Sequence, residues 1–320
     1  MFACRSMLLV LAGLASSVCH AATPDAFTCR SNKERPDPVT TIETTLAGVP
    51  AILRVPKTIT KAPIILWHGF GPPANERALM DALPLDDVPA VKVYLGLPLF
   101  GKRAEEGGVD ALKRRQSTDF ASQLFEPVVM GAAKELPSAL KALQGMGCMT
   151  RKDKIGLFGF SGGGAAVLFA LAERDVPVSS AVILNASTGL SASIAAYEHA
   201  LGKPYAWSDA ARELARRSDA GVRARDIAAG HPPPALLIVQ GTADDTLVPQ
   251  LSVDLNATLD PLYATGDAQR LQLILANGMS HNVTDAASIG GLRKWVADWF
   301  NRYLEAAGSS VEVPVPAKRK

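Results

Sequence analysis

The chain has 320 residues, of which 48% are hydrophobic and 20% are charged, as in a globular protein with one large core, or one core plus an insertion. The formal net charge of +2 excludes the strongly basic footprint of a nucleic-acid-binding protein, so we expect no nucleic-acid partner. The basic end, Lys318-Arg319-Lys320, is interpreted as a solvated tail.

Residues 1–21 have the pattern of an export signal. Arg5 gives a positive start, and the apolar run Met7–Val18 is too short to span a bilayer comfortably. Cys19 and Ala21 supply the small residues that signal peptidase requires, which predicts cleavage after Ala21. The alternative is an uncleaved anchor. Because no later segment is long and apolar enough to span a membrane, we expect a secreted or periplasmic protein.

Cysteine usage agrees with export. Cys4 and Cys19 would leave with the signal, and Cys29 and Cys148 would remain as an even pair in an oxidising compartment. We predict a disulfide between Cys29 and Cys148. The alternative is two separate buried thiols.

Up to residue 143, the sequence predicts four strands with helices and loops between them. In chain order these are strands Thr40–Leu46 and Val49–Val55 joined through Gly48, strand Pro63–Trp67, helix Asn75–Leu83, strand Val91–Leu95 and a surface loop at 97–119 with room for a short helix. Ala121–Leu143 then has helical spacing interrupted at Pro137, which predicts either one kinked helix or two helices.

The second half alternates strands and helices. They are strand Ile155–Phe158, helix Ala165–Ala172, strand Ser180–Leu184, a cap-like insertion of two or three helices at 187–230, strand Ala235–Val239 ending at Gly241, helix Pro249–Tyr263, strand Leu271–Leu275 and helix Ile289–Ala306. This alternation predicts an α/β fold with a mostly parallel sheet covered by helices on both faces. We expect a single domain over 22–308 and a disordered tail at 309–320.

A serine lies in the tight turn between a buried strand and a buried helix. The segment Gly159-Phe160-Ser161-Gly162-Gly163 matches the G-x-S-x-G pattern, which lifts a hydroxyl above the sheet edge in front of a helix N-terminus. Small neighbours let the strand and the helix approach each other. The alternative is a glycine-rich connection with an incidental serine.

A serine hydroxyl needs a base within hydrogen-bond reach, and the base needs an orienting partner. In a parallel sheet such groups follow the carboxyl ends of strands. His281 follows the last strand, whereas His68 ends an earlier strand, His199 falls in the insertion and His231 precedes a strand. Position therefore selects His281 as the base.

The acid is expected after a strand between the serine and the histidine. Asn185 follows one such strand but carries no charge, which rules it out as the acid. Asp244 and Asp245 follow the next strand. We predict Asp244, with Asp245 as the alternative.

The anionic intermediate of acyl transfer needs hydrogen-bond donors aimed at its oxygen. The backbone N–H of Gly162 directly follows the serine, and the loop His68-Gly69-Phe70-Gly71 follows an earlier strand. We predict the N–H groups of Gly162 and Phe70 as these donors.

Together these motifs resemble the α/β-hydrolase family. HGFG after a strand, GFSGG at the turn, GTADD before V-P and GMSH, in the order serine, acid, histidine, are most similar to its dienelactone-hydrolase and prolyl-oligopeptidase-like branches of esterases and peptidases. The resemblance covers about Ile64–Leu304 and implies Ser161 as nucleophile, His281 as base and Asp244 as acid. Dienelactone hydrolases use a cysteine nucleophile, so the serine here argues against that particular substrate.

The sequence thus predicts a serine hydrolase that acts on a small-molecule ester or amide and needs no metal or cofactor. The first hypothesis is hydrolysis of carboxylic esters. The second is cleavage of small peptides by the same groups, and the third is a catalytically inactive hydrolase fold used for binding.

Overall fold

The computed structural model describes residues 27–29, 36–283 and 286–308. The expected export signal at 1–21 and the expected tail at 309–320 lie outside the described residues.

An eight-stranded sheet forms the centre of the molecule, in the order β1-β2-β4-β3-β5-β6-β7-β8. Its strands are β1 Val39–Leu46, β2 Val49–Pro56, β3 Ile64–Trp67, β4 Lys92–Leu95, β5 Ile155–Phe160, β6 Val178–Leu184, β7 Ala235–Ala243 and β8 Leu271–Ser280. β2 is antiparallel to both of its neighbours, and every pair from β4 across to β8 is parallel. The predicted mostly parallel α/β sheet is confirmed.

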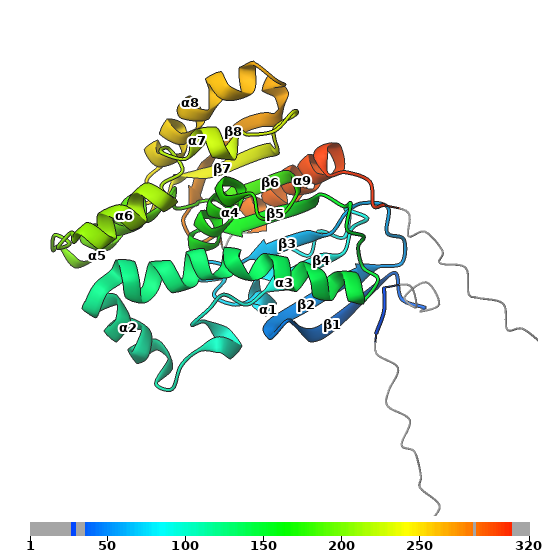
Figure 1. Cartoon of the computed structure of the whole chain (residues 1–320), viewed down its shortest axis with the longest axis horizontal. Helices are drawn as coiled ribbons and strands as arrows, with labels where there is room; N and C mark the ends of the chain where they lie inside the picture. Colours follow the sequence, from blue (N-terminus) through cyan, green and yellow to red (C-terminus); the bar gives the residue numbers. More distant parts are fainter. Residues whose placement is uncertain (1–26, 30–35, 284–285, 309–320) are drawn as a thin grey trace, which may run out of the picture.

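Each face of the sheet has its own apolar core. Along β3, Ile65 and Trp67 belong to one core, and Ile64 and Leu66 belong to the other. Because both faces are buried, the strand is an unbroken apolar run. The covering helices are α3 Gly131–Gly145, α4 Gly162–Glu173 and α8 Gln250–Ala264 on the first face, and α1 Glu76–Ala82 and α9 Ala286–Tyr303 on the second (Figure 1).

The segment 97–119, predicted as a surface loop with room for a short helix, is more helical than expected. It contains a short 3₁₀ turn at Gly101–Arg103 and the twelve-residue helix α2 Gly108–Asp119. Ala111 is the one buried residue of α2, so the helix has no apolar stripe from which its period could be predicted.

The helical segment that follows runs past its prolines. Residues Phe120–Met130 form the π-helical segment η3, and α3 continues directly from it. Pro127 lies inside η3 and Pro137 inside α3. Of the two predicted alternatives, one kinked helix or two helices, the structure therefore has no division at Pro137. The N–H of Gly131 donates to the carbonyl of Glu126, the wide spacing typical of a π-helix.

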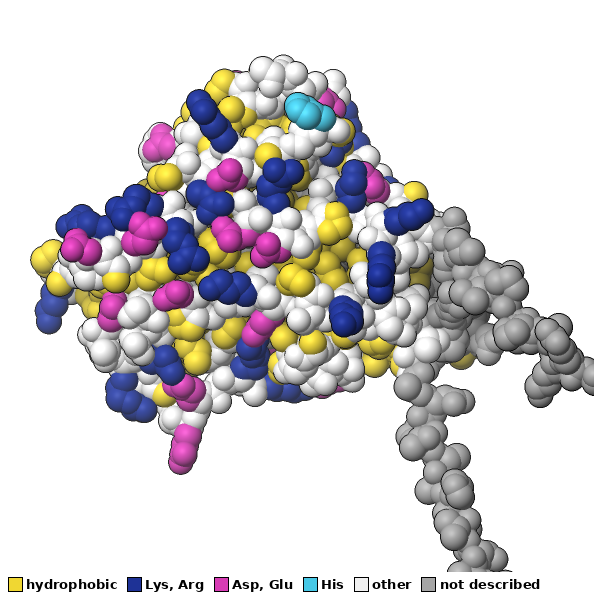
Figure 2. All heavy atoms as spheres, in the orientation of Figure 1, with side chains coloured by type: hydrophobic (Ala, Val, Ile, Leu, Met, Phe, Trp, Pro, Cys, Tyr) yellow, Lys and Arg dark blue, Asp and Glu magenta, His cyan; other side chains and the backbone are white. Residues whose placement is uncertain are grey.

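Between β6 and β7 the chain forms α5 Leu190–Leu201, α6 Asp209–Ser218 and the short α7 Ala224–Ile227. Figure 1 shows α5 and α6 projecting at the left of the view, where they pack against η3. Basic and acidic side chains are interspersed over the face in Figure 2. Within the described ranges, no helix is both long and apolar enough to span a bilayer.

Candidate active site

Ser161 lies at the sharp turn between β5 and α4. Its φ of 54° and ψ of −119° are strained for a residue with a side chain. The turn needs glycine beside it, because a Cβ on Gly163 would lie 2.4 Å from the His68 carbonyl oxygen. A Cβ on Gly159 would lie 2.2 Å from the Gly163 carbonyl oxygen. The small residues predicted around the serine are thus required by close backbone approach.

The Ser161 hydroxyl meets the ring of His281, which directly follows β8. Ser161 Oγ lies 3.1 Å from His281 Nε2, and His281 Nδ1 lies 2.9 Å from Asp244 Oδ2. All three residues are buried. These distances are within hydrogen-bond reach, so the ring can accept the serine proton while the carboxylate orients it.

The structure distinguishes the two adjacent candidates for the acid. Asp244 Oδ1 accepts the N–H groups of Thr246 (3.0 Å) and Leu247 (2.8 Å), which leaves Oδ2 directed at His281. The side chain of Asp245 is exposed and contacts the Thr246 hydroxyl instead. The carboxylate that contacts the imidazole is therefore Asp244.

The loop after β3 lies directly against the serine turn. A Cβ on Gly69 would lie 2.9 Å from the Ser161 Cβ, and a Cβ on Gly162 would lie 2.5 Å from the Phe70 ring. Among the hydrogen bonds of the described residues, neither the Phe70 N–H nor the Gly162 N–H has a protein acceptor. The Gly162 N–H thus lies at the N-terminus of α4, next to Ser161, and the loop that carries the Phe70 N–H packs against the same turn.

His68 fastens this loop and does not contact Ser161. Its Nδ1 donates to the Gly69 carbonyl (2.7 Å), and its Nε2 accepts the Leu97 N–H (3.2 Å). Burial lowers the pKa of His68 to about 4, so the ring is neutral at pH 7. It joins the loop after β3 to the loop after β4.

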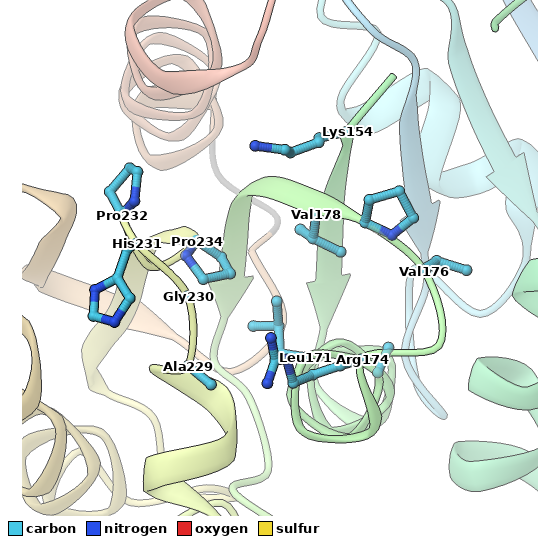
Figure 3. Close-up of a pocket in the computed structure, with 12 residues that line it drawn as sticks. Lys154, Leu171, Arg174, Val176, Val178, Ala229, Gly230, His231, Pro232 and Pro234 are labelled. Carbon is cyan, nitrogen blue, oxygen red and sulfur yellow. The ribbon is translucent and has the colours of Figure 1, made fainter. Parts of the chain in front are cut away.

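The remaining described histidines lie away from the serine. His199 is an exposed residue of α5. His231 lines a hollow of about 230 Å³ with Lys154 and Arg174, next to the amino ends of β5, β6 and β7 (Figure 3). Since Ser161, Asp244 and His281 follow carboxyl ends of strands, this hollow lies at the opposite edge of the sheet.

The contacts of two buried amides near the site were not predicted from the sequence, where Asn185 was considered only as a possible acid. Gln240 Nε2 donates to Asp244 Oδ2 (3.1 Å) and to the Leu247 carbonyl (3.1 Å), and Gln240 Oε1 accepts the Ser252 hydroxyl (2.8 Å). Asn185 is fully buried at the end of β6. The signal for both was a polar amide inside or directly after an apolar run, where a partner is required.

Comparison with known proteins shows the family. The sequence profile described as "Prolyl oligopeptidase family" matches residues 118–307, more than half of the chain. A comparison with curated protein sequences finds no match.

Solved structures with a similar fold include both esterases and peptidases. TT1662 from Thermus thermophilus has a TM-score of 0.61 at 17% identity, over 82% of this chain and 98% of that one. Carboxyl esterase 2 from the mycorrhizal fungus Tuber melanosporum has a TM-score of 0.54 at 20% identity, over 84% and 88%. The acylaminoacyl peptidase of Pyrococcus horikoshii has a TM-score of 0.59 at 16% identity, over 87% of this chain but 43% of the peptidase. The chain belongs to the prolyl oligopeptidase family and is a serine hydrolase with the α/β-hydrolase fold.

Proposed function

We propose that the protein hydrolyses carboxylic esters, with Ser161 as nucleophile, His281 as general base and acid, and Asp244 as the orienting carboxylate. One observation carries the proposal: a continuous line of hydrogen-bond contacts runs from Ser161 Oγ through both ring nitrogens of His281 to Asp244 Oδ2. Nucleophilic acyl transfer requires this order of groups.

The reaction proceeds in two halves. Ser161 Oγ attacks the ester carbonyl carbon while its proton moves to His281 Nε2, and the carbonyl oxygen becomes an oxyanion. The N–H groups of Phe70 and Gly162 are the proposed donors to that oxyanion. Collapse breaks the carbon–oxygen bond to the alcohol, which leaves with the proton from His281. In the second half, His281 takes a proton from water, which attacks the acyl carbon of the acyl-enzyme. The bond to Ser161 Oγ then breaks, His281 returns the proton to Ser161, and the carboxylic acid is released.

An ester rather than an amide substrate is favoured by the extent of the structural matches. This chain spans 88% of the carboxyl esterase from Tuber melanosporum, but 36% of the dipeptidyl peptidase 4 from Porphyromonas gingivalis and 43% of the acylaminoacyl peptidase. The second candidate is cleavage of small peptides, which the family match and these peptidases favour.

The test is hydrolysis of p-nitrophenyl acetate by wild type and by Ser161→Ala. We expect kcat to fall on the order of 10⁵-fold in Ser161→Ala, because the serine and the histidine act as a unit. The matched control is Ser179→Ala, which removes a buried hydroxyl that donates to the Lys154 carbonyl at the far end of β6. Equal rates in wild type and Ser161→Ala would overturn the proposal.

Substrate class is tested by comparing aminoacyl p-nitroanilides with p-nitrophenyl esters of increasing acyl length. Higher kcat/KM on the anilides would favour the peptidase. An inactive fold used for binding would hydrolyse neither series, and Ser161 would not react with a fluorophosphonate probe.

Export belongs to the same proposal. It is supported by the signal pattern at 1–21 and by the pairing of Cys29 with Cys148, whose Cα atoms lie 5.0 Å apart in a disulfide. The mass of the exported protein is expected to correspond to cleavage after Ala21. A full-length chain retained inside the cell would contradict it.

A further inference from the structure

We propose that Asn185 is a positioning residue that sets the place of the His281 ring relative to Ser161. This inference rests on the proposed function. It assigns a role to a residue that carries no charge and does not contact Ser161.

The side chain of Asn185 connects two neighbouring strand ends. Its Nδ2 donates to the carbonyl of Ser280 (3.0 Å) and to the carbonyl of His281 (2.9 Å). Its Oδ1 accepts the N–H of Gly241 at the end of β7 (2.8 Å). One buried amide therefore holds the residue before the proposed base, the base itself, and the strand that leads to the proposed acid.

The backbone around Asn185 extends this connection to the serine. The Ser161 N–H donates to the carbonyl of Leu184, the residue before Asn185 (3.0 Å). The Asn185 N–H donates to the carbonyl of Val239 in β7 (2.9 Å). The chain at 184–185 thus contacts all three segments that carry the proposed catalytic groups.

An irregular pairing between β7 and β8 explains why these backbone groups need a side-chain partner. The register of the two strands shifts between Gly241 and Ala243, and a Cβ on Gly241 would lie 2.2 Å from the Met279 carbonyl oxygen. A shift of this kind takes backbone groups out of the regular ladder. Buried backbone groups left outside a ladder require other partners, and Asn185 supplies them.

Asparagine suits this place in two further respects. Its φ of 42° is in the left-handed region, which asparagine tolerates better than most residues. It offers a donor and an acceptor on one short side chain, and the contacts require both. Aspartate, of the same shape, would present acceptors alone to the two carbonyl oxygens.

The experiment compares Asn185→Asp and Asn185→Gly with wild type on p-nitrophenyl acetate. Glycine accepts the positive φ and removes every side-chain contact, whereas aspartate keeps the shape and removes the donor. Each preparation is titrated with a fluorophosphonate, so that kcat is expressed per reactive serine. We expect kcat per site to fall about 10–100-fold in both variants with KM within about threefold, because small displacements of a catalytic group have effects of this size.

The matched control is Ser187→Ala, two residues further along the chain. The Ser187 hydroxyl hydrogen-bonds with the Gly189 carbonyl, the Gly189 N–H and the Ser193 hydroxyl, and none of these groups belongs to β8. The substitution Ser187→Ala removes buried hydrogen bonds from the same loop. We expect its kcat per site to stay within about threefold of wild type.

The outcomes separate this inference from the proposed function. Wild-type kcat per site in both Asn185 variants, with Ser161→Ala inactive, would overturn the positioning role and leave the ester hydrolase standing. A purely structural role for Asn185 would lower the titrated fraction or the Tm and leave kcat per site unchanged, which also overturns it. Wild-type protein that neither turns over the ester nor reacts with the probe would overturn the proposed function, and this inference with it.

Discussion

At the residue scale, the carboxylate of Asp244 accepts three hydrogen bonds in addition to its contact with His281. Two backbone N–H groups occupy Oδ1, and the amide of Gln240 shares Oδ2 with His281. The side chain of Asp244 is fully buried. A buried carboxylate needs such partners, and they also fix which oxygen faces the ring.

Asp244→Asn is expected to lower kcat about 10⁴-fold, because an amide at this position can hold the imidazole in the wrong tautomer. Asp245→Asn is the matched control, and we expect it to stay within about threefold, because the exposed Asp245 has no contact with the ring. Steady-state kinetics on p-nitrophenyl acetate measure both. A large loss in Asp245→Asn with little loss in Asp244→Asn would reverse the assignment.

The sequence could predict Ser161, His281 and Asp244 as candidates because each is a reactive type at a strand end. It could not separate Asp244 from Asp245, since a shift of one residue after a strand exchanges their directions. It did not predict the contacts of two amides. The role of Asn185 depends on backbone groups of β7 and β8, which are distant in sequence. The role of Gln240 depends on how the turn after β7 folds back onto its side chain. Which backbone groups lack a ladder partner is a property of strand pairing that local sequence does not contain.

Like Asp244, Lys92 is a buried ionisable residue, and burial changes the pKa of Lys92. It begins β4, is fully buried, and donates from Nζ to the Val88 carbonyl (3.1 Å). Burial lowers the pKa of Lys92 to about 8, although Asp86 nearby raises it. Between pH 8 and 10.5 the unfolded chain therefore binds more protons than the folded chain, and stability rises with pH in this window.

Lys92→Met is expected to raise the free energy of unfolding at pH 7, by up to an amount on the order of 3 kcal/mol, because a buried charge is removed at similar volume. The Val88 carbonyl keeps the N–H of Ala90 as a partner. Urea unfolding measures the difference, which should shrink as pH rises from 8 to 10. The exposed Lys152→Met serves as control. A Lys92→Met protein less stable than wild type at pH 7 would contradict the expectation.

At the scale of elements, buried strands were predictable and polar helices were not. Strands β3, β5, β6 and β7 contain buried apolar runs, and β3 needs no alternation because both faces are covered. By contrast, β1 contains threonine and glutamate and is only partly buried. β7 and β8 extend beyond their apolar runs, β7 to Ala243 and β8 to Ser280, so their ends were predicted too early. The length of α2 was not predicted, because a helix with one buried residue has no apolar period. None of these differences moves Ser161, Asp244 or His281 away from the loops that directly follow β5, β7 and β8.

At the scale of the whole molecule, the N-terminal segment is attached to the far end of α3. The Cys29 N–H donates to the Met146 carbonyl (3.0 Å), and the disulfide to Cys148 closes a loop with a sequence separation of 119. This loop includes the segments that form β1 to β4, α1 and α3. In the unfolded chain the disulfide therefore restricts the conformations of all these segments together. The disulfide should therefore raise the free energy of unfolding by more than the contacts that the two cysteines make in the folded protein.

Replacing both cysteines by serine is expected to lower the free energy of unfolding by roughly 4–5 kcal/mol, because the unfolded chain regains the entropy of the open loop. Urea unfolding of the double variant and of wild type, each with and without reductant, measures this. Reductant should destabilise wild type and leave the double variant unchanged, which separates loss of the disulfide from loss of sulfur packing. Equal stability of oxidised and reduced wild type would show that the loop is already constrained by other contacts.

The disulfide should not affect catalysis. We expect the oxidised and the reduced protein to have the same kcat per titrated serine, since the disulfide joins segments away from Ser161 and acts on the unfolded state.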